Sequence, residues 1–242
     1  MPPSRLVAPC VHGRCRLATF LALSLTWVLA LGSAPLSASA APPAPAPPAA
    51  QEIRAYQGQA LSPFDRDYDN SIRGPQKVDP GNFRLQVDGL VAHPLSLTYA
   101  QVVKMDPQRR VVLLPCVEGW SERLLVDGTP LTALFARARP RANATWAVFH
   151  SADGYSTALP LADLAKSHAM LGHHVNGLPL DARRGFPFQL VAEGKLGYKW
   201  AKWVVRVELT DHEVLGYWEQ RGYGNEADSL SEPPLLEKLN SR

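Results

Sequence analysis

Cys116 lies in a short stretch whose residue types and spacing could carry chemistry. It follows an apolar run over residues 110–114, which is typical of a buried strand, and it begins a loop with the sequence Cys-Val-Glu-Gly-Trp-Ser. The other two cysteines, Cys10 and Cys15, fall in a predicted leader, so Cys116 is the only thiol expected in the mature chain. An unpaired thiol where a strand ends suits a working side chain, and it equally suits a small buried hydrophobe. Both interpretations are open on these residues alone.

A second stretch, residues 185–203, combines glycines, lysines and aromatic side chains. Backbone amides made accessible by glycine, together with Lys195, Lys199 and Lys202, can hold a phosphate, and aromatic rings can wall a flat heterocycle. The alternative is a glycine-rich loop that leads into a core strand and carries lysines facing solvent. The residues do not decide between the two.

The sequence lacks the motifs of several common kinds of catalytic or binding site. It has no glycine-rich phosphate loop of the P-loop or Rossmann type, no cysteine pair for zinc and no His-Glu-x-x-His motif. His173 and His174 are adjacent and would point apart in a strand, which argues against a shared metal. Cys116 could pair with His150 or His173 as in a cysteine protease, but its neighbours do not resemble those of papain-like enzymes.

Short strands and short helices in irregular alternation are expected to position these residues. Strands are predicted over residues 83–91, 110–114, 124–126, 145–150, 156–159, 188–192 and 201–209, and helices over 96–103, 131–138 and 161–165. Turns are predicted at residues 127–130 and at Asn176-Gly177. This pattern predicts an α+β fold with a mixed, mainly antiparallel sheet.

The N-terminus has the three-part pattern of a secretory signal, assigned to residues 1–40. Three arginines and no acid precede an apolar run over residues 17–32, and small residues at 37–40 offer a cleavage site. An uncleaved membrane anchor is the alternative interpretation. The chain has 25 Lys and Arg against 22 Asp and Glu, and the leader arginines account for the excess. The balanced remainder gives no indication of a surface that binds nucleic acid.

Composition divides the rest of the chain into three parts. Residues 41–66 begin with a Pro/Ala tract and are predicted to be a loosely packed linker. Residues 67–225 are predicted to form one domain, and residues 226–242 a frayed tail.

Five stretches, in order along the chain, resemble the molybdopterin-dependent oxidoreductases of the sulfite-oxidase fold, in their bacterial periplasmic branch. They are residues 116–121, 153–155, 176–180, 185–203 and 216–223. The resemblance implies the fold of that family, and molybdenum and molybdopterin as cofactors.

The resemblance also implies a site. In this family a cysteine thiolate binds molybdenum together with the dithiolene of one molybdopterin, so Cys116 would be the metal ligand. Glu118, Trp120 and Tyr155 would lie near the open face of the metal as catalytic residues. Besides Cys116, the cofactor would be bound by Asn70, Arg184, Gly185, Gln189, Gly197, Lys199 and Lys202. The lysines at 199 and 202 are the candidates for its phosphate.

The sequence departs from the family pattern at several of these positions. Relatives often have His where Arg184 stands and Arg where Gln189 stands. Sulfite oxidases tend to carry an arginine close after the cysteine, whereas this chain has Glu118 and Trp120. A carboxylate beside the metal would repel sulfite, so the loop is more similar to the sulfoxide-reductase branch.

The resemblance therefore implies oxygen-atom transfer on a small sulfur or nitrogen oxide, with the reductase direction favoured. No haem motif is present, so electrons would be exchanged with a separate protein, such as a membrane haem or quinone-linked protein. The leader predicts a periplasmic or exported protein, tethered to the membrane if the leader is not cleaved. The alternative is a non-catalytic cofactor-binding or interaction module of the same fold.

Overall fold

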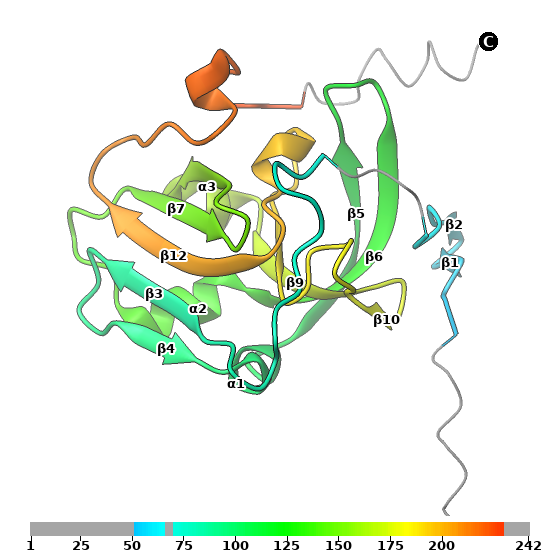
Figure 1. Ribbon diagram of the computed structural model, residues 1–242, viewed down its shortest axis with the longest axis horizontal. Helices are drawn as coiled ribbons and strands as arrows, with labels where there is room; N and C mark the ends of the chain where they lie inside the picture. Colours follow the sequence, from blue (N-terminus) through cyan, green and yellow to red (C-terminus); the bar gives the residue numbers. More distant parts are fainter. Residues whose placement is uncertain (1–50, 66–69, 230–242) are drawn as a thin grey trace, which may run out of the picture. The chain divides into compact units, whose positions relative to one another are not determined.

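The structure is a computed structural model that describes residues 51–65 and 70–229. The predicted leader and the Pro/Ala tract lie outside these residues. Within the described part, two five-stranded sheets form the framework (Figure 1). None of the helices in that part has the length and hydropathy of a membrane span.

The first sheet has the strand order β4-β3-β12-β7-β8. Its strands are β3 (Leu85–Gly89), β4 (Leu95–Leu97), β7 (Trp146–Ser151), β8 (Ser156–Pro160) and β12 (Val204–Thr210). β12 pairs with β3 in parallel, and the other three pairs are antiparallel. Val207 and Leu209 of β12 are buried while Arg206 and Glu208 between them are half-exposed, as the alternation of this stretch predicts.

The second sheet has the order β10-β9-β6-β5, and β11 also pairs with β9. Its strands are β5 (Gln108–Pro115), β6 (Ser121–Pro130), β9 (Met170–Val175), β10 (Leu178–Pro179) and β11 (Gln189–Val191). All of its pairs are antiparallel. β5 and β6 form a long hairpin whose register ends at the pair Pro115–Ser121 (Figure 1).

The helices are short. They are α1 (Tyr99–Val103), α2 (Leu131–Ala138), α3 (Leu161–Lys166) and the single 3-10 turns η1 (Gly197–Lys199) and η2 (Glu219–Arg221). One buried apolar cluster contains side chains from both sheets and from all three α-helices. These features confirm the predicted α+β class with a mixed sheet.

Two predicted elements are wrong in detail. The helix predicted from residue 96 begins at Tyr99, because Thr98 caps it and residues 95–97 pair with β3 as β4. The turn predicted at residues 127–130 is the continuation of β6, with a shift of register between Asp127 and Gly128. A Cβ atom at Gly128 would lie 2.8 Å from the carbonyl oxygen of Leu171, so glycine here serves close strand packing.

Both ends of the described part belong to the fold, in contrast to the predicted linker and tail. β1 (Ala55–Tyr56) and β2 (Gln59–Ala60) form a small hairpin, and the amide of Ile53 donates to the carbonyl of Asn176. At the other end, the amide of Ser229 donates to the carbonyl of Gly194 at 2.8 Å. Residues 51–65 and 226–229 are therefore ordered parts of the domain.

Candidate active site

Cys116 occupies the tip of the β5–β6 hairpin. Its amide donates to the carbonyl of Trp120 at 2.8 Å, and its own carbonyl accepts from the amide of Gly119 at 3.1 Å. Gly119 has a φ of 88°, a left-handed conformation that favours glycine and closes this turn. Cys116 is half-buried, and it is a free cysteine. The hairpin therefore holds the thiol on a rigid turn.

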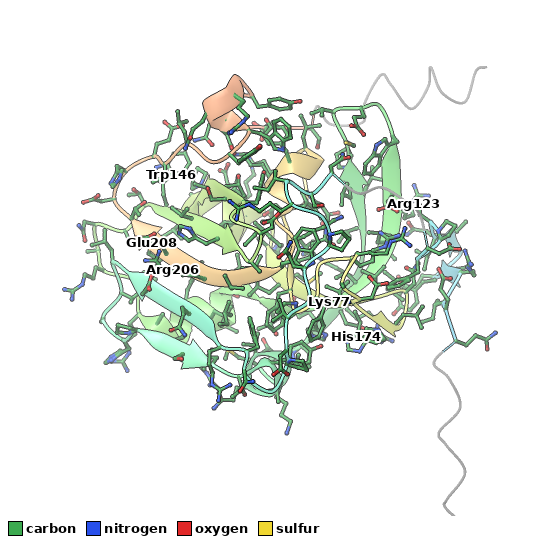
Figure 2. The ribbon with its side chains drawn as sticks, in the orientation of Figure 1. Lys77, Arg123, Trp146, His174, Arg206 and Glu208 are labelled. Atoms are coloured by element: carbon green, nitrogen blue, oxygen red, sulfur yellow. The ribbon has the colours of Figure 1, made fainter. Side chains whose placement is uncertain are left out.

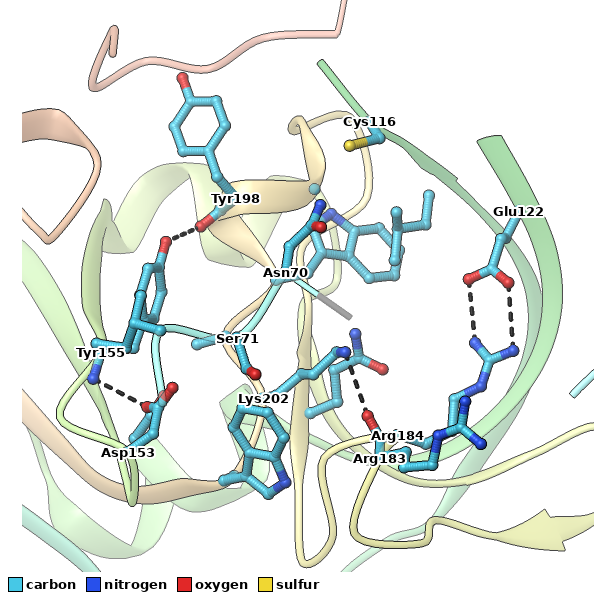
Figure 3. Close-up of a pocket in the computed structure, with 18 of the residues that line it drawn as sticks. Asn70, Ser71, Cys116, Glu122, Asp153, Tyr155, Arg183, Arg184, Tyr198 and Lys202 are labelled. Atoms are coloured by element: carbon cyan, nitrogen blue, oxygen red, sulfur yellow. Dashed lines mark hydrogen bonds and ion pairs between the residues drawn. The ribbon is translucent and has the colours of Figure 1, made fainter. Parts of the chain in front are cut away.

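The thiol opens into a pocket of about 470 Å³. Its walls come from the Cys116 loop, the segment that includes residues 70–72, the loop after β7, the segment between β10 and β11, and η1 (Figure 3). Nine of the predicted site residues line it: Asn70, Cys116, Glu118, Trp120, Tyr155, Arg184, Gln189, Gly197 and Lys202. Gly185 and Lys199 do not line it. These nine residues, of which the first and last, Asn70 and Lys202, are 132 positions apart, are thus brought to one cavity.

Glu118 is held beside the thiol by two N–H donors. Its Oε2 accepts a hydrogen bond from the indole Nε1 of Trp120 at 2.9 Å and a longer one from Nδ2 of Asn70 at 3.4 Å. The same oxygen lies 3.9 Å from Sγ of Cys116. Glu118 is exposed at the pocket, so its carboxylate is accessible to solvent.

Burial and the charge of Glu118 raise the pKa of the Cys116 thiol, and backbone amides of Val117 and Glu118 oppose this rise. The thiol is therefore not a spontaneous thiolate of the kind that serves as a nucleophile. Coordination to a metal ion would supply the driving force for its deprotonation.

Tyr155 closes the pocket on another side (Figure 3). Its hydroxyl donates to the backbone carbonyl of Tyr198, and its amide donates to Oδ1 of Asp153 at 2.9 Å. Burial, followed by the charge of Glu219, strongly raises the pKa of Tyr155. Burial likewise raises the pKa of Tyr198 to about 12. Both phenols are neutral at physiological pH.

Gly197 and Gly185 each allow the backbone to lie close to a neighbouring side chain. A Cβ atom on Gly197 would lie 3.3 Å from Cδ2 of Leu114, next to the thiol loop. A Cβ atom on Gly185, where φ is 100°, would lie 2.9 Å from Cβ of Lys202. Gly185 therefore contributes by making room for the stem of Lys202, whose Nζ donates to the carbonyl of Arg183 at 3.2 Å.

The prediction that Lys199 binds the cofactor phosphate needs correction. Its side chain is fully buried, and Nζ donates to Oε1 of Glu219 at 2.5 Å, to Oδ1 of Asn225 at 2.6 Å and to the carbonyl of Ala158 at 3.0 Å. These contacts use all three donors of the ammonium group. The 3-10 turn η1 directs Lys199 into the core, away from the pocket that Tyr198 and Gly197 line.

The guanidinium of Arg184 reaches the pocket wall but is engaged by protein groups. It donates to both carboxylate oxygens of Glu122, at 3.0 and 3.2 Å (Figure 3). It also donates to the carbonyls of Pro63 and Phe64. These contacts use four of its five N–H groups. At most one N–H remains for a cofactor.

Ser151 is a pocket residue that sequence reasoning missed. Its Oγ is buried and has no hydrogen-bond partner among the residues that the structure describes, although it lies in the pocket lining. Asp153, also buried and lining the pocket, belongs to the noted stretch 153–155 but was not singled out. Neither residue type nor spacing marks Ser151 as part of a site, and only the fold brings it there.

Apolar side chains at the pocket were also missed. Val117 and Tyr223 line it and are 45% and 37% exposed, and Trp218 lines it beside them. The ring of Tyr223 lies 5.1 Å from that of Tyr198 and 5.2 Å from that of Trp218. The recurrence of aromatics in residues 217–223 is the signal that could have identified this wall.

The pocket fits a molybdopterin-held molybdenum. It offers one thiol as a soft ligand for a metal–sulfur centre and an ammonium group on Lys202 for a phosphate. It also offers a buried hydroxyl on Ser151 that has no partner within the described part of the chain. Its volume lies in the range of cofactor sites. Cys116 would hold the metal, while Ser151, Gln189 and Lys202 would hold the organic part.

The adjacent histidines do not point apart as expected. Nδ1 of His173 lies 2.7 Å from Nδ1 of His174, with the rings nearly perpendicular. Across residues 51–65 and 70–229, there is no group of three or more His, Cys, Asp and Glu side chains that could hold a metal. His150 pairs with Glu208 at 3.0 Å, so it is not oriented as a protease base for Cys116.

Comparisons with known proteins identify the family of the chain. The model of the oxidoreductase molybdopterin binding domain family matches residues 72–218, more than half of the chain. YedZ1 of Azospira oryzae is 33% identical over 162 residues, which cover 66% of this chain and 61% of YedZ1. The uncharacterized oxidoreductase YuiH of Bacillus subtilis is 31% identical over 155 residues, covering 64% of this chain and 78% of YuiH.

A third relative is the protein-methionine-sulfoxide reductase catalytic subunit MsrP of Ralstonia nicotianae. It is 30% identical over 231 residues, covering 81% of this chain and 70% of MsrP. The sulfane dehydrogenase SoxCD of Paracoccus pantotrophus shares the fold, with a TM-score of 0.58, 22% identity, and coverage of 68% of this chain and 45% of that chain. The chain therefore belongs to the molybdopterin-binding oxidoreductases of the sulfite-oxidase fold.

Proposed function

We propose that this oxidoreductase uses molybdenum to reduce a neutral sulfoxide, carried on the methionine side chains of polypeptides, to a thioether. The observation that carries this proposal is the placement of Glu118 beside Cys116. Its carboxylate accepts from Trp120 and Asn70 within 3.9 Å of the thiol that would bind the metal.

The chain's own groups fit the proton requirement of this reaction. Reduction of a sulfoxide to a thioether consumes two electrons and two protons and releases the oxygen as water. When bound, the cofactor supplies two-electron oxygen-atom-transfer chemistry. Glu118 is exposed, so it can take a proton from solvent and hold it next to the departing oxygen. The indole N–H of Trp120 fixes the direction of the carboxylate.

The charge and shape of the pocket favour a neutral substrate over an anion. A carboxylate at the thiol repels sulfite, whereas a sulfoxide carries no net charge. The exposed apolar side chains of Val117 and Tyr223 offer a contact surface for the carbon chain of a methionine. The name of the MsrP relative, a protein-methionine-sulfoxide reductase, supports this substrate class.

The proposal includes an exported enzyme that receives electrons from a separate redox protein. The secretory pattern of residues 1–40 supports export, and the absence of a haem motif from the sequence supports an external electron donor. The name of the MsrP relative, a catalytic subunit, supports a partner protein.

Steady-state kinetics with cofactor-loaded protein test the proposal. With an artificial electron donor, peptide methionine sulfoxide should be reduced efficiently, and with an artificial acceptor, sulfite should be oxidised poorly. Glu118→Gln should lower the sulfoxide rate by about 10²–10⁴-fold, the contribution of a general acid. Glu193→Gln, which removes the same charge at a half-exposed carboxylate outside the pocket lining, is the control. Sulfite as the better substrate, or an unchanged rate in Glu118→Gln, would refute the proposal.

A further inference from the structure

We infer that Arg184 is a positioning residue, which holds residues 62–65 in place as a wall of the cofactor pocket. This inference rests on the proposed function, since it takes the pocket as the molybdopterin site. It differs from the expectation that Arg184 binds the cofactor directly. Phe64 and Asp65 line the pocket together with Arg184, so the segment that Arg184 holds is part of the site.

The guanidinium joins this segment to the β5–β6 hairpin. Two of its nitrogens form a double contact with the carboxylate of Glu122 on β6, at 3.0 and 3.2 Å. Nε donates to the carbonyl of Phe64 at 2.7 Å, and Nη2 donates to the carbonyl of Pro63 at 3.0 Å. The guanidinium also lies over the ring of Phe64, 5.3 Å from its centre.

The ion pair between Arg184 and Glu122 is largely buried. The side chains of Arg184 and Glu122 are 12% and 4% exposed. A buried ion pair is stable only when further hydrogen bonds satisfy its remaining groups, and the two backbone carbonyls supply them here. The segment therefore completes the ion pair, and the ion pair fixes the segment.

A second set of contacts, which does not involve Arg184, holds the same segment. The amide of Phe64 donates to Oε1 of Glu52 at 2.6 Å, and Nδ2 of Asn176 donates to the carbonyl of Ser62 at 2.8 Å. The amide of Ser62 donates to the carbonyl of Arg123 at 2.8 Å. Glu52 and Asn176 do not line the pocket, so they can be changed without touching a bound cofactor.

A positioning role and a direct cofactor-binding role of Arg184 predict different outcomes when residues 62–65 lose a contact that Arg184 does not make. If Arg184 acts through the wall, Glu52→Ala should weaken cofactor retention although Arg184 is intact. If Arg184 binds the cofactor directly, only a change of Arg184 itself should do so. The exchange of backbone amides in cofactor-free protein reports on the wall independently of any activity.

The experiment compares Arg184→Met, Glu52→Ala and the control Arg206→Gln with the wild type. Arg206 lies beside Glu208 on β12 (Figure 2). It pairs with Asp88 and Glu208, and it does not line the pocket. Hydrogen exchange is measured for residues 61–65 in cofactor-free protein, and molybdopterin is measured per chain after purification and dialysis of loaded protein.

We expect Arg184→Met and Glu52→Ala each to raise amide exchange at residues 61–65 by about tenfold or more and to lose most of the molybdopterin on dialysis. Arg206→Gln should change neither quantity. Loss of molybdopterin in Arg184→Met without faster exchange, or full retention in Glu52→Ala despite faster exchange, would overturn the inference. If Arg184→Met does not fold, Glu52→Ala alone decides.

The failure of the proposed function and the failure of the inference can be distinguished. Wild-type protein without molybdopterin would refute the proposed function. Exchange rates equal to those of the wild type in both cofactor-free variants would still overturn the inference.

Discussion

Replacement of Lys199 by methionine is expected to destabilise the domain strongly, although Lys199 lies outside the pocket lining. The side chains of Lys199 and Glu219 are both fully buried, and the distance from Nζ to Oε1 is 2.5 Å. Methionine has a similar length but no donors, so it would remove the contacts with Glu219, Asn225 and Ala158 together. The carboxylate of Glu219 would then remain buried, with the hydroxyl of Thr157 as its remaining hydrogen-bond donor of those the structure describes.

The expected cost follows from the burial of both partners. Loss of one partner from a buried ion pair costs about 3–5 kcal/mol, because the remaining charge has no compensation. Removal of both charges avoids that penalty. The double variant Lys199→Met with Glu219→Gln should therefore recover about half of the lost stability or more, since glutamine still accepts from Thr157.

Urea unfolding of cofactor-free protein at pH 7 measures these differences in the free energy of unfolding. Lys166→Met, which removes the same charge from an exposed position on α3, is the matched control and should change stability by less than about 0.5 kcal/mol. Two results would contradict the expected contribution of the buried ion pair to the free energy of unfolding. One is a cost below about 1 kcal/mol for Lys199→Met, and the other is a double variant as unstable as the single one.

Two further predictions concern pH and the cofactor. Burial lowers the pKa of His173 to about 4, from its ordinary value of 6.5. Between these values the unfolded chain binds a proton that the native protein does not, so stability should fall on acidification by on the order of 2–3 kcal/mol. Urea titrations from pH 7 to pH 4 should show a shallower fall in His173→Gln than in the wild type, and equal slopes would contradict the assignment. Lys202→Ala should purify with much less molybdopterin while the melting temperature of its empty form changes little, and normal pterin content would show that Lys202 does not hold the phosphate.

The parts of the site that lie close together in the sequence could be predicted from it. The loop after β5, with Cys116, Glu118 and Trp120, is a contiguous stretch whose strand and turn are encoded locally. In the structure the indole N–H of Trp120 donates to Glu118, and Glu118 lies beside Cys116. The catalytic and metal-binding roles of these residues stay predictions.

The parts that depend on tertiary packing could not be predicted. Lys199 and Lys202 look equivalent in the sequence, but one 3-10 turn sends the first into the core and leaves the second in the pocket lining. Residues 51–65 carry no hydrophobic pattern that predicts packing against the domain. They are held by hydrogen bonds from Asn176 and Arg184, which are distant in the sequence, so these contacts could not be predicted from it. The start of α1 was missed because pairing with β3 overrides the helical preference of residues 96 and 97.

The molybdenum and molybdopterin content of protein from its native host, measured per chain for wild type and Cys116→Ser, tests the central claim most directly. Serine keeps the size and the hairpin but replaces the soft sulfur ligand with a hard oxygen. We predict about one molybdenum per chain in the wild type. The Cys116→Ser variant should fold with the melting temperature of the cofactor-free wild type and lose the metal and the turnover. Active wild-type protein without molybdenum, or a Cys116→Ser variant that keeps both metal and activity, would contradict the assignment of Cys116 as the metal ligand.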